Sequence, residues 1–250
     1  MRFDRKGRRA QFLMARAAES NYHTRLRQIA QQIDLVVKGF SLSDLTPAEQ
    51  QQQTNRIVNT LRSYAEVIEP WAVSVAKYMV ADVSRRNAAQ WKQNGKDMGL
   101  ALQVELEQAP TGGLFTSLMN EQVRLIKSLP LDAAERVHML TTKGMVSGTR
   151  AKEIAAEILH TGEVSASRAR LIARTEVART ASNFTQARAR FAGSDGYIWR
   201  TSGDGDVRET HKAMEGKYVR WDTPPKTDTS LGPYHAGCGP NCRCYPEPIF

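Results

Sequence analysis

Several features that would identify a class of protein at once are missing from this sequence. Its 250 residues contain no apolar run of about 18 residues, so no segment is predicted to cross a membrane as a helix. Residues 1–9 are basic and are not followed by the apolar core of a signal peptide, so we expect no export. Only three cysteines occur, all between Cys238 and Cys244, which argues against a disulfide scaffold. These absences favour a protein of a reducing cytoplasm.

Motifs that mark common enzyme classes are missing as well. The sequence has no glycine-rich phosphate loop, no nucleophile elbow and no zinc-protease motif. His211 lies close to Asp204 and Asp206 in the chain, which would allow a nuclease or phosphodiesterase. A histidine in a short helix is, however, more often a hydrogen-bonded structural residue. We therefore expect that the chain is not an enzyme.

Positive charge is what the sequence has in excess. With 35 Lys and Arg against 26 Asp and Glu, the net charge is +9, which favours polyanions or acidic surfaces as partners. The excess is concentrated in residues 1–27 and 168–190. Solvated helix faces explain such clusters as readily as contacts with nucleic acid, so both interpretations stay open. The candidate phosphate or DNA contacts are Arg5, Arg8, Arg9 and Arg170.

Residues 1–110 have a helical pattern throughout. Apolar residues three and four apart form one stripe along the first helix, which ends at Gly39. The segment Thr46-Pro47-Ala48-Glu49 is a capping box with proline at the first helical position, so it begins the second helix. That helix continues to Pro70, and further helices are predicted over about 71–95 and 98–107.

The turn-forming segment Pro110-Thr111-Gly112-Gly113 is the expected boundary between a helical region, 1–110, and a second region, 111–250. In the second region, helices are predicted over 114–128, 132–142, 149–160 and 165–192, the last of them capped by Ser165. Short strands are predicted only after Gly193, over 197–201, 217–221 and 242–245. The expected fold class is α+β, predominantly α-helical, with a small C-terminal α+β module (194–250) of short strands and long loops.

The helix predicted over 165–192 has an unusual surface. One stripe consists mostly of small residues, which would let another backbone approach closely; its members are Leu171, Thr175, Ala178, Ser182, Thr185 and Ala189. Arg170 and Arg174 are one turn apart, so their repulsion must be relieved by a tertiary carboxylate or an external phosphate. We favour internal ion pairs for Arg174 and for Glu176, which can pair with Arg179.

The C-terminal module carries residues of the kinds that bind metals. Two apart on a strand, Cys242 and Cys244 point to the same side. With His211 and His235 they would form a nitrogen and sulfur set suited to structural zinc, and Cys238 is an alternative ligand. Packed free thiols and a disulfide between Cys238 and Cys242 stay open. Because residues 222–241 have few apolar side chains to order them, we expect both histidines, Cys242 and Cys244 to lie close together, with or without metal.

The order of these pieces resembles the phage Mu F-type head-morphogenesis domain, the minor capsid protein family of tailed bacteriophages. The resemblance covers about residues 115–250, and its matching segments are Ile172–Glu176 with Arg179, Trp199–Ser202, Asp206–Arg208 with His211, Gly216-Lys217, Asn241–Cys244 and Pro246. The resemblance implies a set of family signature residues in this sequence, which are Arg174, Glu176, Asp206, Arg208, His211, Asn241 and Arg243, with Cys242 and Cys244. We interpret them as a structural centre that ties the loops together.

The resemblance implies a minor head protein, built into the phage prohead at the portal vertex, that acts in head assembly and in DNA packaging or delivery. It implies the portal protein and the major capsid or scaffold proteins as partners, with viral DNA nearby and no membrane. The protein would be located in the virion head after assembly in the host cytoplasm. Residues 1–110 lie outside the resemblance, and we expect them to dock on the portal. The alternatives are a stand-alone nucleic-acid-binding protein and, third, a metal-dependent nuclease or toxin-like enzyme.

Overall fold

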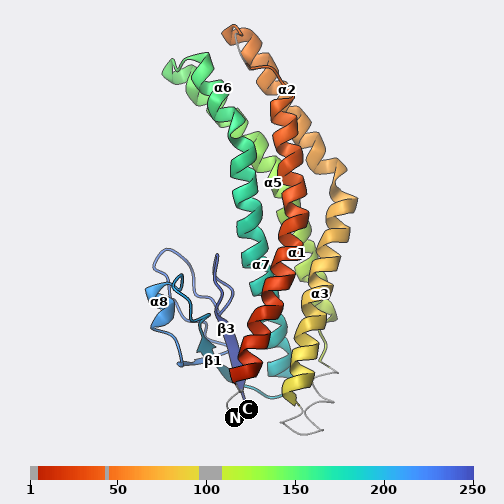
Figure 1. The fold of residues 1–250 in the computed structure, drawn as a ribbon, viewed down its shortest axis with the longest axis vertical. Helices are drawn as coiled ribbons and strands as arrows, with labels where there is room; N and C mark the ends of the chain where they lie inside the picture. The colour runs from red at the N-terminus through yellow and green to blue at the C-terminus, as the bar shows by residue number, and fades with distance from the viewer. Residues whose placement is uncertain (1–4, 43–44, 96–108) are drawn as a thin grey trace. The chain divides into compact units, whose positions relative to one another are not determined.

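The computed structural model describes residues 5–42, 45–95 and 109–250. Its long helices are α1 (Arg5–Lys38), α2 (Pro47–Val67), α3 (Glu69–Gly95), α5 (Gly112–Ser147), α6 (Ala151–Leu159) and α7 (Thr161–Phe191) (Figure 1). The remaining elements are the short helix α8 (Glu209–Lys212) and the strands β1 (Gly196–Arg200), β2 (Tyr218–Arg220) and β3 (Tyr245–Ile249). The predicted α+β class, predominantly helical, is confirmed, and within the described residues the short strands all lie after Gly193. The helix predicted over 98–107 lies outside the described residues.

Local chemistry sets the end of the first helix and the start of the second as predicted, whereas the second helix ends at Val67, before the predicted Pro70. Helix α1 ends at Lys38, directly before Gly39. At the start of α2, the backbone N–H of Glu49 donates to Thr46 Oγ1 at 3.4 Å. The backbone N–H of Thr46 in turn donates to the Glu49 carboxylate at 2.9 Å, which completes the capping box.

The structure differs from the predicted helix boundaries at two further places, between residues 128 and 132 and at Ser165. Helices predicted over 114–128 and 132–142 are one helix, α5, with Pro130 inside it; the buried face formed by Ile126, Leu129 and Val137 continues across the proline and offsets its lost hydrogen bond. The predicted start of the last helix at Ser165 is also wrong. Helix α7 begins at Thr161, and the Ser165 hydroxyl donates to the Thr161 carbonyl inside it at 2.9 Å.

The three strands form one antiparallel sheet in the order β2-β1-β3. In the register, Tyr197 lies opposite Val219 and Trp199 opposite Pro246. The third strand lies later than predicted, since it begins at Tyr245 and the cysteines precede it in irregular backbone. Proline is tolerated in β3 because this strand is an edge of the sheet.

Packing divides the chain into two compact units. The sheet unit comprises Met1–Tyr22, Lys77–Met119 and Ala173–Phe250, and the helical unit comprises His23–Ala76 and Asn120–Ile172. The sheet unit has an aromatic core that includes Trp91, Tyr197, Trp199 and Trp221. No helix within the described residues is both long and apolar enough to cross a membrane. The predicted domain boundary at residue 110, which separates the expected portal-docking region from the rest of the chain, stays a prediction.

Candidate metal centre

Helix α8 carries His211 into the core of the sheet unit. Arg208 is the N-cap residue of this four-residue helix, and His211 is only 2% exposed. The imidazole packs edge-on against the fully buried indole of Trp199 in β1, with ring centroids 5.5 Å apart. This aromatic contact restricts the orientation of the imidazole ring independently of its polar contacts.

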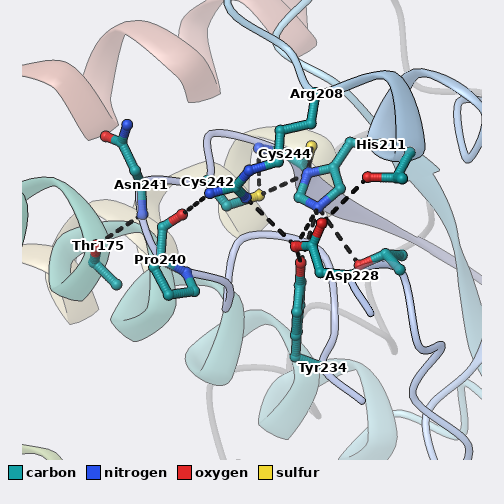
Figure 2. A network of polar contacts seen from close by, with 11 residues as sticks. Thr175, Arg208, His211, Asp228, Tyr234, Pro240, Asn241, Cys242 and Cys244 are labelled. Carbon is teal, nitrogen blue, oxygen red and sulfur yellow. Dashed lines mark hydrogen bonds and ion pairs between the residues drawn. The ribbon is translucent and has the colours of Figure 1, made fainter. Parts of the chain in front are cut away.

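Two sulfur atoms face one nitrogen of that imidazole. His211 Nδ1 lies 3.5 Å from Cys242 Sγ and 3.5 Å from Cys244 Sγ. All three residues are buried, and their ligand atoms lie within 4.8 Å of one another. Figure 2 shows the two sulfurs on one side of the ring and Tyr234 with Asp228 on the other. We call His211, Cys242 and Cys244 the His/Cys cluster.

Two of the predicted ligands lie outside the cluster. His235 Nδ1 is 3.2 Å from the Tyr197 hydroxyl, and its ring packs edge-on against Tyr197 and Trp221. Burial there lowers the pKa of His235, so the neutral ring is favoured. Cys238 Sγ instead contacts Asn183 Oδ1 at 4.0 Å. The predicted joining of His235 to the cluster is therefore not what the structure shows.

The three cysteines are free thiols, so the disulfide between Cys238 and Cys242 is not formed. The side chains of Cys238 and Cys242 have different surroundings. Cys238 faces α7, where burial raises its pKa to about 11, whereas Cys242 faces His211.

The segment that carries Cys242 is anchored to α7 through Asn241. Asn241 has a left-handed backbone with φ of 57°. Its N–H donates to Thr175 Oγ1 at 2.9 Å, and its Oδ1 accepts from Arg174 Nη1 at 2.9 Å. Arg174 also pairs with Glu19 at 3.3 Å, and Glu176 pairs with Arg179 at 2.6 Å. The internal ion pairs expected for Arg174 and Glu176 are thus present.

Two further arginines hold the same segment from other sides. Arg208 Nη2 donates to the Pro240 carbonyl at 2.7 Å. Arg243, between the two cysteines, pairs with Asp204 at 2.7 Å and with Asp206 at 3.1 Å. The signature residues around the cluster therefore contact one another or the backbone beside the cysteines.

The loop before Asn241 packs closely against the stripe of small residues on α7, as predicted. Gly237 has φ of 83°, and a Cβ there would lie 2.8 Å from the Cys244 carbonyl and 3.4 Å from Ser182 Cβ. The Ser182 hydroxyl donates to the Ala236 carbonyl at 2.6 Å. Any side chain at position 237 would push the loop away from both the helix and the cysteines.

Sequence reasoning missed two residues of the site, Tyr234 and Asp228. The Tyr234 hydroxyl lies 3.0 Å from His211 Nε2 and donates a short hydrogen bond to Asp228. Asp228 Oδ2 is itself 3.7 Å from His211 Nε2. The hydrogen bond from Tyr234 lowers the pKa of Asp228, and Arg208 and His211 act in the same direction. Both residues lie in the patternless segment 222–241, where spacing carries no signal.

The predicted phosphate contacts are not part of this site. Arg170 is exposed on α7 and belongs to the helical unit. Arg5, Arg8 and Arg9 lie in α1, but their side chains are outside the described part of the chain.

The proximity of Cys242 and Cys244 shifts their pKa values in opposite directions. The pKa of Cys242 is lowered, chiefly by the neighbouring Cys244 thiol. The pKa of Cys244 rises, since its proton is held by Cys242 and burial disfavours a second thiolate. The buried indole N–H of Trp199 has no nitrogen or oxygen partner among the described residues, and it favours a thiolate at Cys244.

These three donors fit three positions of a tetrahedral metal ion with a preference for nitrogen and sulfur. Typical zinc–nitrogen and zinc–sulfur bonds at a tetrahedral angle separate the two donor atoms by roughly 3.5 Å, and both nitrogen–sulfur distances in the cluster are 3.5 Å. A bound cation would stabilise the second thiolate, which the protein alone disfavours. The cluster can therefore hold a metal ion.

Comparison with known proteins identifies the region around this cluster. Residues 135–246 match the sequence model of the family described as phage Mu protein F like protein. This region belongs to the Mu F-like family. The match includes every signature residue as well as the His/Cys cluster, so the resemblance found in the sequence is confirmed, and it relates the chain to phage head proteins.

A longer relative extends the similarity. An uncharacterized protein of Haemophilus influenzae is 30% identical over 181 residues, which cover 72% of this chain and 39% of that protein. The chain thus spans about two fifths of the length of this relative. No solved structure matches.

Proposed function

We propose that this Mu F-like chain is a minor head protein of a tailed bacteriophage that acts in head assembly at the portal vertex. The observation that carries the proposal is the match of residues 135–246 to the Mu F-like family. The proposed partners are the portal protein and the major capsid or scaffold proteins, with viral DNA close by during packaging or delivery. The protein would be assembled in the host cytoplasm and reside in the virion head.

The proposal gives the cysteine module a structural role instead of a catalytic one. Its support is that His211 is 2% exposed and that Arg174, Arg208 and Arg243 each contact internal acceptors. A phosphodiester substrate would have to displace these partners before it could reach the imidazole.

A structural zinc ion held by His211, Cys242 and Cys244 is part of this proposal. The distances between the donor atoms and the chemistry of the donors support it. When bound, the ion would supply a cross-link between α8 and the segment before β3, and the loop between them would then be closed at both ends.

Docking on the portal is assigned to the helices of residues 1–110. The first 27 of these residues carry a net positive charge, which suits an acidic partner surface. The test is co-expression with the portal protein of the same phage and affinity capture of the portal. We expect wild type to retain the portal protein, and the triple variant Arg5→Glu, Arg8→Glu, Arg9→Glu to retain much less.

The matched control places the same charge change on exposed residues of the module: Lys217→Glu, Arg220→Glu, Lys226→Glu. Failure of wild type to capture portal protein would overturn the head-protein proposal. Loss of capture in the control but not in the N-terminal variant would overturn the assignment of docking to residues 1–110. Duplex binding that weakens steeply with salt would instead favour a stand-alone nucleic-acid-binding protein.

A further inference from the structure

We infer that Tyr234 and Asp228 are positioning residues that fix the tautomer of His211 so that it binds metal through Nδ1. This inference rests on the proposed zinc centre and adds to it two residues that would not touch the ion. Neither residue belongs to the signature.

The geometry separates the two nitrogens of the imidazole. Nδ1 faces the sulfurs of Cys242 and Cys244, both at 3.5 Å. Nε2 faces oxygen atoms: the Tyr234 hydroxyl at 3.0 Å, Thr227 Oγ1 at 3.5 Å and Asp228 Oδ2 at 3.7 Å. A neutral imidazole has one N–H and one lone pair, and only the nitrogen with the lone pair can bind a metal.

The hydroxyl of Tyr234 decides which nitrogen has the lone pair. It has a single hydrogen, and Asp228, an acceptor when ionised, takes that hydrogen in a short bond. The Tyr234 oxygen therefore presents a lone pair to Nε2, which favours the imidazole hydrogen on Nε2. The lone pair of the ring is left on Nδ1, which is the nitrogen that faces both sulfurs.

Asp228 is held in place by residues on α8 and directly before it. Thr210 Oγ1 donates to Asp228 at 3.4 Å, and Arg208 Nη1 lies 3.7 Å from its carboxylate. The same Arg208 side chain donates to the Pro240 carbonyl, two residues before Cys242. One guanidinium thus orients both the carboxylate behind the histidine and the segment that carries a sulfur ligand.

The tyrosine ring has little freedom to leave this position. It packs edge-on against the His211 ring, with centroids 6.0 Å apart. A Cβ at Gly239 would come within 2.7 Å of the Tyr234 ring. Glycine at position 239 therefore provides the space in which Tyr234 reaches His211.

The first measurement is zinc affinity of the full chain, prepared metal-free and titrated in competition with a chromophoric chelator. Removal of a residue that hydrogen-bonds a metal ligand typically weakens metal binding 10–100-fold. We expect losses of about this size for Tyr234→Phe and for Asp228→Asn, although both variants keep all three ligand atoms. The controls are Tyr218→Phe and Asp222→Asn, which change exposed residues of the same types and should bind zinc as wild type does. Cobalt substitution shows through its thiolate absorption whether both sulfurs still bind.

The second measurement is the tautomer of His211 in the metal-free protein, read from ¹⁵N shifts of the ring in buffer alkaline enough for a neutral imidazole. We expect the tautomer with hydrogen on Nε2 in wild type and a mixture in Tyr234→Phe. Unchanged zinc affinity and an unchanged tautomer in both variants would overturn the positioning role while leaving the zinc site in place. Absence of zinc binding by wild type would overturn the zinc proposal, and the tautomer would still decide the roles of Tyr234 and Asp228.

Discussion

Replacing Asn241 tests how far the anchor on α7 stabilises the sheet unit. Asn241→Ala removes the side-chain acceptor of Arg174 and places alanine at φ of 57°. A residue with a Cβ costs about 1–2 kcal/mol in left-handed backbone, where asparagine is better tolerated. A hydrogen bond to a charged group contributes about 1.5–3 kcal/mol, but this one is exposed, so we take about 1 kcal/mol.

We therefore expect Asn241→Ala to lower the free energy of unfolding by about 2 kcal/mol. Asn241→Gly relieves the backbone and loses only the hydrogen bond, so it should cost about half as much. The assay is urea unfolding followed by tryptophan fluorescence, because Trp199 and Trp221 are buried in the sheet unit. A loss below about 0.5 kcal/mol for alanine, the usual size for an unimportant surface site, would refute the reasoning. Equal losses for alanine and glycine would refute its backbone part.

Three further predictions follow from the packing and the charges. In zinc-loaded protein, a chelator should speed amide hydrogen exchange in the sheet unit and spare the helical unit, and equal acceleration in both would contradict this. Gly162→Ala should destabilise the helical unit by about 1–3 kcal/mol in thermal unfolding, because its Cβ would lie 2.2 Å from Asp34 Oδ1. Gly113→Ala, whose Cβ would meet no atom of the described residues within 4 Å, should be neutral or stabilising. Because the pKa of Asp228 is lowered, the stability it provides is present above its unfolded pKa of about 3.9 and lost as pH falls through the lower folded value. Asp228→Asn should therefore flatten the decline of stability in that acidic range, and an unchanged acid profile would show that this ion pairing contributes nothing.

The helix boundaries show where sequence reasoning succeeds. Thr46 and Glu49 define a helix start by hydrogen bonds within four residues, so the pattern alone predicts the capping box. Pro130 and Ser165 depend on distant packing. A proline usually ends a helix, but the apolar face of α5 continues on both sides of it, and that face is buried. Gly162 lies just beyond the helix predicted over 149–160, and the structure places it in the first turn of α7, where it allows close approach to Asp34.

The ligand set shows the same division between local and tertiary causes. Cys242 and Cys244 were expected on one side of a strand, and both sulfurs do face His211, although the strand itself begins at Tyr245. His235 could not be excluded by its residue type. Only the fold shows that an aromatic pocket and the Tyr197 hydroxyl occupy its ring.

The segment 222–241 raises the question of what orders a long loop without an apolar core of its own. Polar contacts from two helices, α8 and α7, hold it at several points. Asp228 and Tyr234 bind each other behind His211 of α8, Ala236 accepts from Ser182 of α7, and Asn241 is bound by Thr175 of the same helix. Each contact is worth only about 1 kcal/mol net, while ordering each residue costs a similar amount. These hydrogen bonds alone therefore do not offset the cost of ordering the segment, and a metal ion that joins α8 to the far end of the loop would add to its stabilisation. This is why the loop, more than the sheet or the long helices, should respond first when the His/Cys cluster is altered.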